Sequence, residues 1–158
     1  FRSSIVMTYY NRKNQLKLTL DQFEKIYNNK YNFEVIIVDD KSDENNCLIN
    51  LIQNYNFEIK LIKILEKDWI NAVVPNNIGF KNITGDIVIL QNPEIFHCGD
   101  ILGDIQTRNL ENMYYTYPVF ASPTFQTNKI IENLSNDNSN DNSNDNSNDN
   151  SNDNSNDN

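Results

Sequence analysis

An apolar run that ends at two carboxylates, residues 33–40 (FEVIIVDD), places the strongest constraint on how this 158-residue chain folds. Val35 begins four consecutive β-branched residues, the pattern of a strand that is buried on both faces in a parallel sheet. Asp39 and Asp40 follow at once. Because ligands of open α/β sheets bind outside the carboxyl ends of the strands, these two carboxylates predict a binding crevice at that edge.

Strands and helices alternate along the rest of the chain. Apolar runs predict further strands at residues 4–7, 57–64 and 86–90. Helical spacing predicts a helix from Leu16 to Tyr27 capped by Asn11 or Asn14, and others at residues 48–55, at 75–83 and from Ile101 onward, the last capped by Asp100. Alternating strands and helices imply right-handed crossovers and a mostly parallel sheet, so the predicted fold class is α/β.

The last part of the chain has a different composition. Residues 113–121 are rich in aromatic side chains and are predicted as a fifth strand, and residues 123–134 as a final helix. Residues 135–158 are copies of the tetrapeptide SNDN without one apolar residue, so we expect them to be disordered. The predicted organisation is therefore one folded domain at residues 1–134 and a low-complexity tail at residues 135–158.

Composition excludes several classes of protein. The formal charge is −9, but the tail supplies six of the 22 acidic residues, and residues 1–134 carry 16 acidic against 13 basic residues, which does not suit a nucleic-acid-binding surface. No apolar run approaches the roughly 18 residues that span a bilayer. Cys47 and Cys98 are too few for a disulfide framework, so we expect a reducing compartment, the cytoplasm. The chain begins at Phe1 instead of methionine, as a fragment of a longer protein would.

Polar residues follow three of the predicted strands. They are the corner at residues 8–12, the pair Asp39 and Asp40, and Glu94 with His97. In a parallel sheet these segments would open on the same edge. A carboxylate accepts hydrogen bonds from an imide or a ribose, and Glu94 and His97 are suitable ligands for a first-row metal. The chain has neither a Gly-x-Gly-x-x-Gly motif nor a Walker loop, which argues against an ordinary dinucleotide or P-loop enzyme.

Three segments together resemble family 2 glycosyltransferases, the nucleotide-sugar-dependent enzymes with the GT-A fold. They are residues 4–12 (SIVMTYYNR), which match the opening strand and nucleotide loop, residues 34–42 (EVIIVDDKS), which match the second strand, and residues 77–88 (NIGFKNITGDIV), which match the helix and Gly-Asp turn before the metal strand. Their order and spacing also agree with the family, over residues 4 to about 100.

The resemblance implies a set of ligand-binding residues. Asp40 would accept a hydrogen bond from the uracil ring and Asp39 would support the turn. The family's Asp-x-Asp, which holds a divalent cation (Mn²⁺ or Mg²⁺) against the diphosphate, falls on Asn92 and Glu94, so an amide replaces the first carboxylate. Either the metal affinity is then weaker, or His97 or Asp100 contributes a further ligand. The implied nucleotide-binding residues are Thr8, Tyr10, Asn11, Arg12, Asp39, Asp40, Asn77 and Asn92, and the implied metal ligands are Glu94 and His97.

The resemblance further implies transfer of a sugar, with inversion, from a UDP-sugar to a hydroxyl of a glycan, protein or lipid. The family's catalytic base is an acidic residue in the later, acceptor-binding part of the domain, and no acidic residue after Asp104 is a convincing candidate here. The acceptor half could therefore lie in a longer parent protein, or the chain could be a non-catalytic nucleotide-sugar-binding or scaffold module. A sugar nucleotidyltransferase fits less well, because the first loop lacks a glycine-rich, basic phosphate-binding segment.

Structural roles are the alternatives for the same residues. Asp39 and Asp40 would serve equally as turn formers and helix caps, and Thr8 and Asn11 as caps of the first helix. Residues 92–94 would then be an ordinary loop, and His97 a partly buried loop residue.

Overall fold

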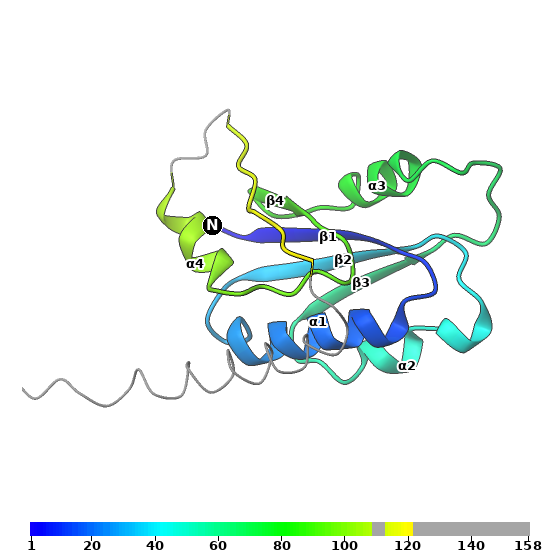
Figure 1. Cartoon of the computed structure of the whole chain (residues 1–158), viewed down its shortest axis with the longest axis horizontal. Helices are drawn as coiled ribbons and strands as arrows, with labels where there is room; N and C mark the ends of the chain where they lie inside the picture. Colours follow the sequence, from blue (N-terminus) through cyan, green and yellow to red (C-terminus); the bar gives the residue numbers. More distant parts are fainter. Residues whose placement is uncertain (109–112, 122–158) are drawn as a thin grey trace, which may run out of the picture. The chain divides into compact units, whose positions relative to one another are not determined.

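The computed structural model describes residues 1–108 and 113–121 and contains one sheet of four parallel strands in the order β3-β2-β1-β4 (Figure 1). The strands are β1 (Ser3–Tyr9), β2 (Phe33–Asp39), β3 (Glu58–Lys63) and β4 (Ile87–Leu90). The helices are α1 (Lys13–Ile26), α2 (Ile49–Ile52), α3 (Val73–Phe80) and α4 (Ile101–Thr107), with a 3-10 turn, η1 (Glu44–Asn46). The predicted α/β class with a parallel sheet is confirmed.

The order of the strands reverses at β1. The chain moves from β1 outward to β2 and β3, and then returns to place β4 on the other side of β1. Ser3 pairs with Phe33 and Tyr9 with Asp39, so β1 and β2 end level with each other. In open parallel sheets the crevice outside such a reversal is where ligands bind, and here it lies at the carboxyl ends of β1 and its neighbours.

Helices cover both faces of the sheet. In Figure 1, α1 and α2 lie on one side of the strands and α3 on the other. Consecutive strand residues point to opposite faces, so β1 and β2 each contribute to two cores, and every residue of β2 is buried. The larger core, on the α1 side, includes Ile5, Met7, Leu16, Leu20, Phe23, Val35 and Ile37. The smaller core, on the α3 side, is formed by Val6, Ile36, Val38 and Ile64.

Helix α3 approaches the sheet closely because Gly79 faces it. A Cβ atom at Gly79 would lie 2.5 Å from Cγ1 of Val6 and 3.3 Å from Cγ2 of Val38. Valine side chains are stiff and cannot move aside cheaply. Glycine therefore sets the distance between α3 and the sheet, and with it the position of the first turn of α3 near the end of β1.

A buried carboxylate, Glu34, joins the amino ends of the strands. Its side chain is fully buried, and Oε1 accepts hydrogen bonds from Ser4 Oγ at 2.6 Å, Thr84 N at 2.7 Å and Thr84 Oγ1 at 2.9 Å. Arg2 and Lys60 approach Oε2 at 3.4 and 3.8 Å. Burial opposes ionisation, but these hydrogen bonds and the Arg2 charge outweigh it and hold the pKa of Glu34 below its usual value.

Three expected elements differ from the structure. The predicted helix at residues 48–55 is only α2, because Tyr55 turns toward α1, donates to Asp21 Oδ1 at 2.9 Å and stacks on Phe57. The N-cap position of α1 is Arg12, without a side-chain cap, because Asn11 binds Asp43 instead. Residues 113–121 do not form the predicted strand, and Pro118, which has no N–H, cannot support one. The helix expected at residues 123–134 lies outside the described residues.

Two further features of the fold concern α4 and β4. Asp100 caps α4 as expected, accepting from Gly103 N. Strand β4 leaves one face open, since Val88 is 42% and Leu90 53% exposed. Among the helices that the structure describes, none has the length and apolar character to cross a membrane.

We predict that Glu34→Gln lowers the free energy of unfolding by about 2–4 kcal/mol, because it removes a charge that Arg2 and Lys60 face in a buried site. Urea denaturation at pH 7 would measure this loss. Because the folded-state pKa lies below the ordinary 4.5, the stabilisation by Glu34 is present above that pH and is lost as the pH falls through the folded-state value. The wild type and the variant should therefore converge in acid.

Glu58→Gln is the matched control, since Glu58 also pairs with Arg2, at 2.6 Å, but is exposed. It should cost less than about 1 kcal/mol. Equal losses for the two variants would contradict a special role for Glu34.

Candidate functional site

Two turns interlock at the carboxyl ends of β1 and β2. Asn11 N donates to Ser42 Oγ at 3.0 Å, and Asp43 N donates to Asn11 Oδ1 at 2.9 Å. Asn11 and Lys41 adopt left-handed backbone conformations, with φ of 50° and 66°. Asparagine tolerates this region better than most residues, which explains its presence at the corner. The two turns therefore form one rigid unit beneath the crevice.

Asp39 closes the turn after β2. Its Oδ1 accepts from Ser42 N at 2.9 Å, its carbonyl accepts from Ile64 N at 2.9 Å, and the residue is buried. Tyr9 lies opposite Asp39 in the sheet, and burial, followed by the Asp39 charge, raises the pKa of Tyr9 to about 12. Asp39 thus stabilises the turn after β2.

Asp40 presents an unpartnered carboxylate oxygen. The residue is only 8% exposed, Oδ2 pairs with Lys67 Nζ at 2.8 Å, and Oδ1 is buried without a hydrogen-bond partner. Lys67 Nζ also lies 5.1 Å from the ring centre of Tyr10, in cation–π contact. A buried carboxylate oxygen without a donor is costly, so Oδ1 of Asp40 is available to accept a hydrogen bond from a ligand.

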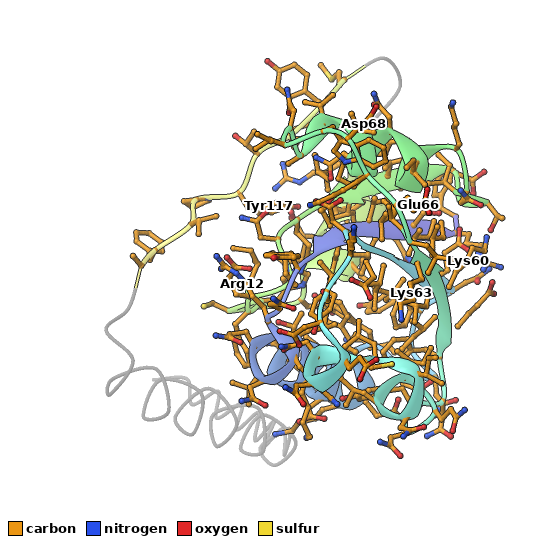
Figure 2. All side chains as sticks on the ribbon, turned by 90° about the vertical axis from the view of Figure 1, so that its right-hand side faces the viewer. Arg12, Lys60, Lys63, Glu66, Asp68 and Tyr117 are labelled. Carbon is orange, nitrogen blue, oxygen red and sulfur yellow. The ribbon has the colours of Figure 1, made fainter. Side chains whose placement is uncertain are left out.

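A hollow of about 280 Å³ adjoins this pair. It is lined by Glu66, Lys67 and Asp68, on the segment between β3 and α3. Figure 2 looks onto this edge of the sheet and shows Glu66 and Asp68 on that segment, with Arg12 on the other side of the view.

The end of β1 contacts the first turn of α3. Thr8 Oγ1 donates to Asn76 Oδ1 at 2.5 Å. Asn77, the residue that the resemblance places at the nucleotide, is exposed, and no contact joins its side chain to the site. The structure thus gives the inward-facing position to Asn76, because Asn76 lies three residues before Gly79 and shares its face of α3.

The loop after β4 meets the β1 corner. Glu94 forms an ion pair with Arg12, and both side chains are partly exposed. Asn92 is exposed, and its carbonyl accepts from Ile95 N at 3.2 Å. Asn92 and Glu94 therefore reach the crevice from the opposite side to Asp40 and Lys67.

His97 does not join them as a metal ligand in this structure. Its ring is buried, with Nδ1 at 2.7 Å from Tyr27 Oη and Nε2 at 2.8 Å from Gln91 Oε1. Burial lowers the pKa of His97 to about 4, so the ring is neutral at pH 7. Both ring nitrogens are engaged in this structure, by Tyr27 and Gln91, so a metal role for His97 would require them to be released, and that role stays a prediction.

Without His97, the side-chain oxygens of Asn92 and Glu94 are still suitable ligands for a hard divalent cation. Asn92 and Glu94 offer an amide and a carboxylate oxygen, the donors that Mg²⁺ and Mn²⁺ prefer, and Mg²⁺ commonly takes only one or two protein carboxylates beside phosphate oxygens and water. Within residues 1–108 and 113–121, no three His, Cys, Asp or Glu side chains cluster as a complete metal site. Ligand oxygens would therefore have to complete the coordination.

Comparison with known proteins identifies the family. The sequence model of glycosyl transferase family 2 matches residues 4–94. The chain belongs to glycosyltransferase family 2. Two of the segments that carry the resemblance in the sequence, residues 4–12 and 34–42, form the turns at the carboxyl ends of β1 and β2.

Curated and structural relatives agree with this assignment. Poly(ribitol-phosphate) β-N-acetylglucosaminyltransferase TarP of Staphylococcus aureus strain N315 is 29% identical over 112 residues, which are 70% of this chain and 31% of TarP. The crystal structure of S. aureus TarS matches with a TM-score of 0.58 and 20% identity, over 68% of this chain and 19% of TarS. The crystal structure of TarS 1–349 matches with a TM-score of 0.52 and 21% identity, over 60% of this chain and 28% of the TarS 1–349 chain. The GT-A-like fold is thereby confirmed, and the chain spans less than a third of these relatives.

Two site residues were not predicted from the sequence. Lys67 lies in a polar segment with no motif, and only the three-dimensional return of the loop after β3 brings it to Asp40. Asn76 could have been found, because a glycine that faces the sheet implies an inward-facing residue three positions earlier on the same helix.

We predict that Asp39→Ala lowers the free energy of unfolding by about 1–3 kcal/mol, because Ser42 N–H loses its acceptor in the turn. Asp39→Asn is the control, since an amide oxygen can still accept, and its effect should be less than half as large. Chemical denaturation compares the three proteins. An asparagine variant as unstable as the alanine variant would mean that the charge, and not the turn hydrogen bond, is what matters.

Proposed function

We propose that this chain supplies the donor-binding half of a glycosyltransferase that uses a UDP-sugar. The observation that carries the proposal is the buried, unpartnered Oδ1 of Asp40 beside the ammonium group of Lys67. Uracil presents an N3–H donor flanked by two carbonyl acceptors, which this acceptor–donor pair complements. Cytosine has an acceptor at N3 and its amino donor at N4, so its pattern of donors and acceptors matches this pair less well. A solved structure with a similar fold, TarS 1–349, was determined in complex with UDP-GlcNAc (TM-score 0.50, 21% identity), which makes UDP-GlcNAc the first donor to test.

The diphosphate would lie between the uracil site and the loop after β4. Asn92 and Glu94 would hold a divalent cation there, and the cation would neutralise charge on the leaving diphosphate. Arg12, now paired with Glu94, lies at the same place and supplies a second positive charge.

The transfer proposed is a single displacement with inversion. An acceptor hydroxyl oxygen attacks the anomeric carbon from the face opposite the diphosphate, the bond from that carbon to the diphosphate oxygen breaks, and the hydroxyl proton passes to a base. The described residues account for the donor side of this reaction. The acceptor would be a hydroxyl of a glycan, protein or lipid, and the unpaired thiols of Cys47 and Cys98 support a reducing, cytoplasmic setting.

Calorimetric titration of UDP and CDP, with and without Mn²⁺, tests the donor site. We expect UDP to bind more tightly than CDP, and Asp40→Ala to weaken UDP by about 1–3 kcal/mol with little effect on CDP. Glu94→Gln should remove most of the gain in affinity that Mn²⁺ provides. Asp21→Ala, which alters a carboxylate on the exposed side of α1, is the control. No binding of UDP at millimolar concentration would refute the donor site.

A measurement of catalytic turnover distinguishes an active glycosyltransferase from a module that only binds the nucleotide sugar. One observation favours the non-catalytic alternative: Glu94 is the one carboxylate at the two positions matched to the family's Asp-x-Asp, since the other is Asn92, and Glu94 is paired with Arg12. We expect slow, Mn²⁺-dependent release of UDP from UDP-GlcNAc, detected by a coupled assay. Binding of UDP-GlcNAc without any release, including after acceptors are supplied, would favour the module.

A further inference from the structure

The ten-residue loop Gln91 to Asp100 follows β4 without regular secondary structure, yet side chains of α1 hold its backbone. An irregular loop of this kind has no ladder to satisfy its N–H and C=O groups. Here Thr19 and Gln22, three residues apart on α1, bond the loop backbone, and Tyr27, the C-cap residue of α1, bonds the ring of His97. We call these three residues the polar stripe of α1.

Gln22 binds the backbone of His97 through both halves of its amide. Its Oε1 accepts from His97 N at 2.8 Å, and its Nε2 donates to His97 O. This is the pairing that a neighbouring strand would provide. Gln22 is buried, so its amide has no alternative partner in water, and the loop is fixed at His97.

Tyr27 and the His97 ring continue the network toward the crevice. Gln91 Oε1 can only accept, so the His97 Nε2 atom at 2.8 Å carries the proton and Nδ1 accepts from Tyr27 Oη at 2.7 Å. Tyr27 Oη in turn accepts from Ile101 N at 3.2 Å. The chain of hydrogen bonds thus runs from the start of α4 to Gln91, the residue before Asn92.

Thr19 holds the loop at the point nearest the site. Its hydroxyl, which is buried, donates to Pro93 O at 2.9 Å, with Ile95 O at 3.3 Å as a second acceptor. Pro93 lies between Asn92 and Glu94. A hydrogen bond to its carbonyl therefore fixes the peptide that separates the two side chains proposed to face the diphosphate.

We propose that the polar stripe of α1, with His97 as its partner on the loop, positions Asn92 and Glu94 for the diphosphate of the donor. None of these four residues touches the ligand, so they are positioning residues. The inference rests on the proposed function, in which Asn92 and Glu94 act on the diphosphate. It also explains the burial of His97 between α1 and the loop.

Thr19→Val and Tyr27→Phe test this role, because each removes one hydroxyl and keeps the shape of the side chain. Tyr55→Phe is the matched control: it deletes a hydroxyl bonded to Asp21 on α1, away from the loop. Affinities for UDP and for UMP are measured by calorimetry in the presence of Mn²⁺ on the full chain. The ratio of the two affinities reports contacts to the second phosphate, and hydrogen exchange of the loop peptides reports whether the loop is loosened.

We expect each stripe variant to reduce the UDP-to-UMP affinity ratio about fivefold, the effect of one net hydrogen bond, with UMP affinity unchanged and loop exchange accelerated. Tyr55→Phe should change none of these. An unchanged ratio in variants with faster loop exchange would overturn the inference, as would equal losses of UDP and UMP affinity, the result of a purely structural role. A wild type that binds neither nucleotide would refute the proposed function itself.

Discussion

The buried carboxylate of Glu34 is the interaction on which the arrangement of the sheet depends. An isolated charge in the interior of a sheet would be strongly destabilising; here three hydrogen bonds to Oε1 and the charges of Arg2 and Lys60 near Oε2 compensate it. Its partners come from β1, from β3 and from the turn before β4. One side chain of β2 thus connects all four strands at their amino ends. Because Gly85 N also donates to Ser4 Oγ at 2.9 Å, the turn before β4 is held to β1 twice.

The strand register, which Glu34 fixes at the amino ends of the strands, determines which side chains lie at their carboxyl ends. A slip of one residue would turn every side chain of a strand to the opposite face. In the observed register Tyr9, Asp39 and Lys63 end level, so Asp39 turns toward the Ser42 turn and Asp40 toward Lys67. Two adjacent aspartates therefore have different roles, one in the scaffold and one facing the crevice.

The sequence predicted the parts of this molecule that depend on local pattern. The central strand, the acidic strand end and the family all follow from residues 4–94, because burial on both faces and turn chemistry are expressed in consecutive residues. Lys67 and Asn76 were missed because their partners are 27 and 68 residues away in the chain. The metal role expected for His97 stays a prediction, but its hydrogen bonds with Tyr27 and Gln91 could not be foreseen, because no local pattern reveals a hydrogen bond across 70 residues.

Asp40 and Glu94, the two carboxylates of the crevice, differ in how exposed their ion pairs with basic side chains are. Lys67 and Asp40 are largely buried, with side chains 25% and 11% exposed, whereas Arg12 and Glu94 are 53% and 33% exposed. Exposed ion pairs contribute at most about 1 kcal/mol, so exchange of partners between Arg12, Glu94 and an entering diphosphate costs little. The Lys67–Asp40 pair is less screened and keeps its geometry before the ligand arrives. In the proposed donor site, the uracil end would therefore be ordered before the ligand binds, whereas the diphosphate end would depend on the α1 side chains that hold the loop after β4.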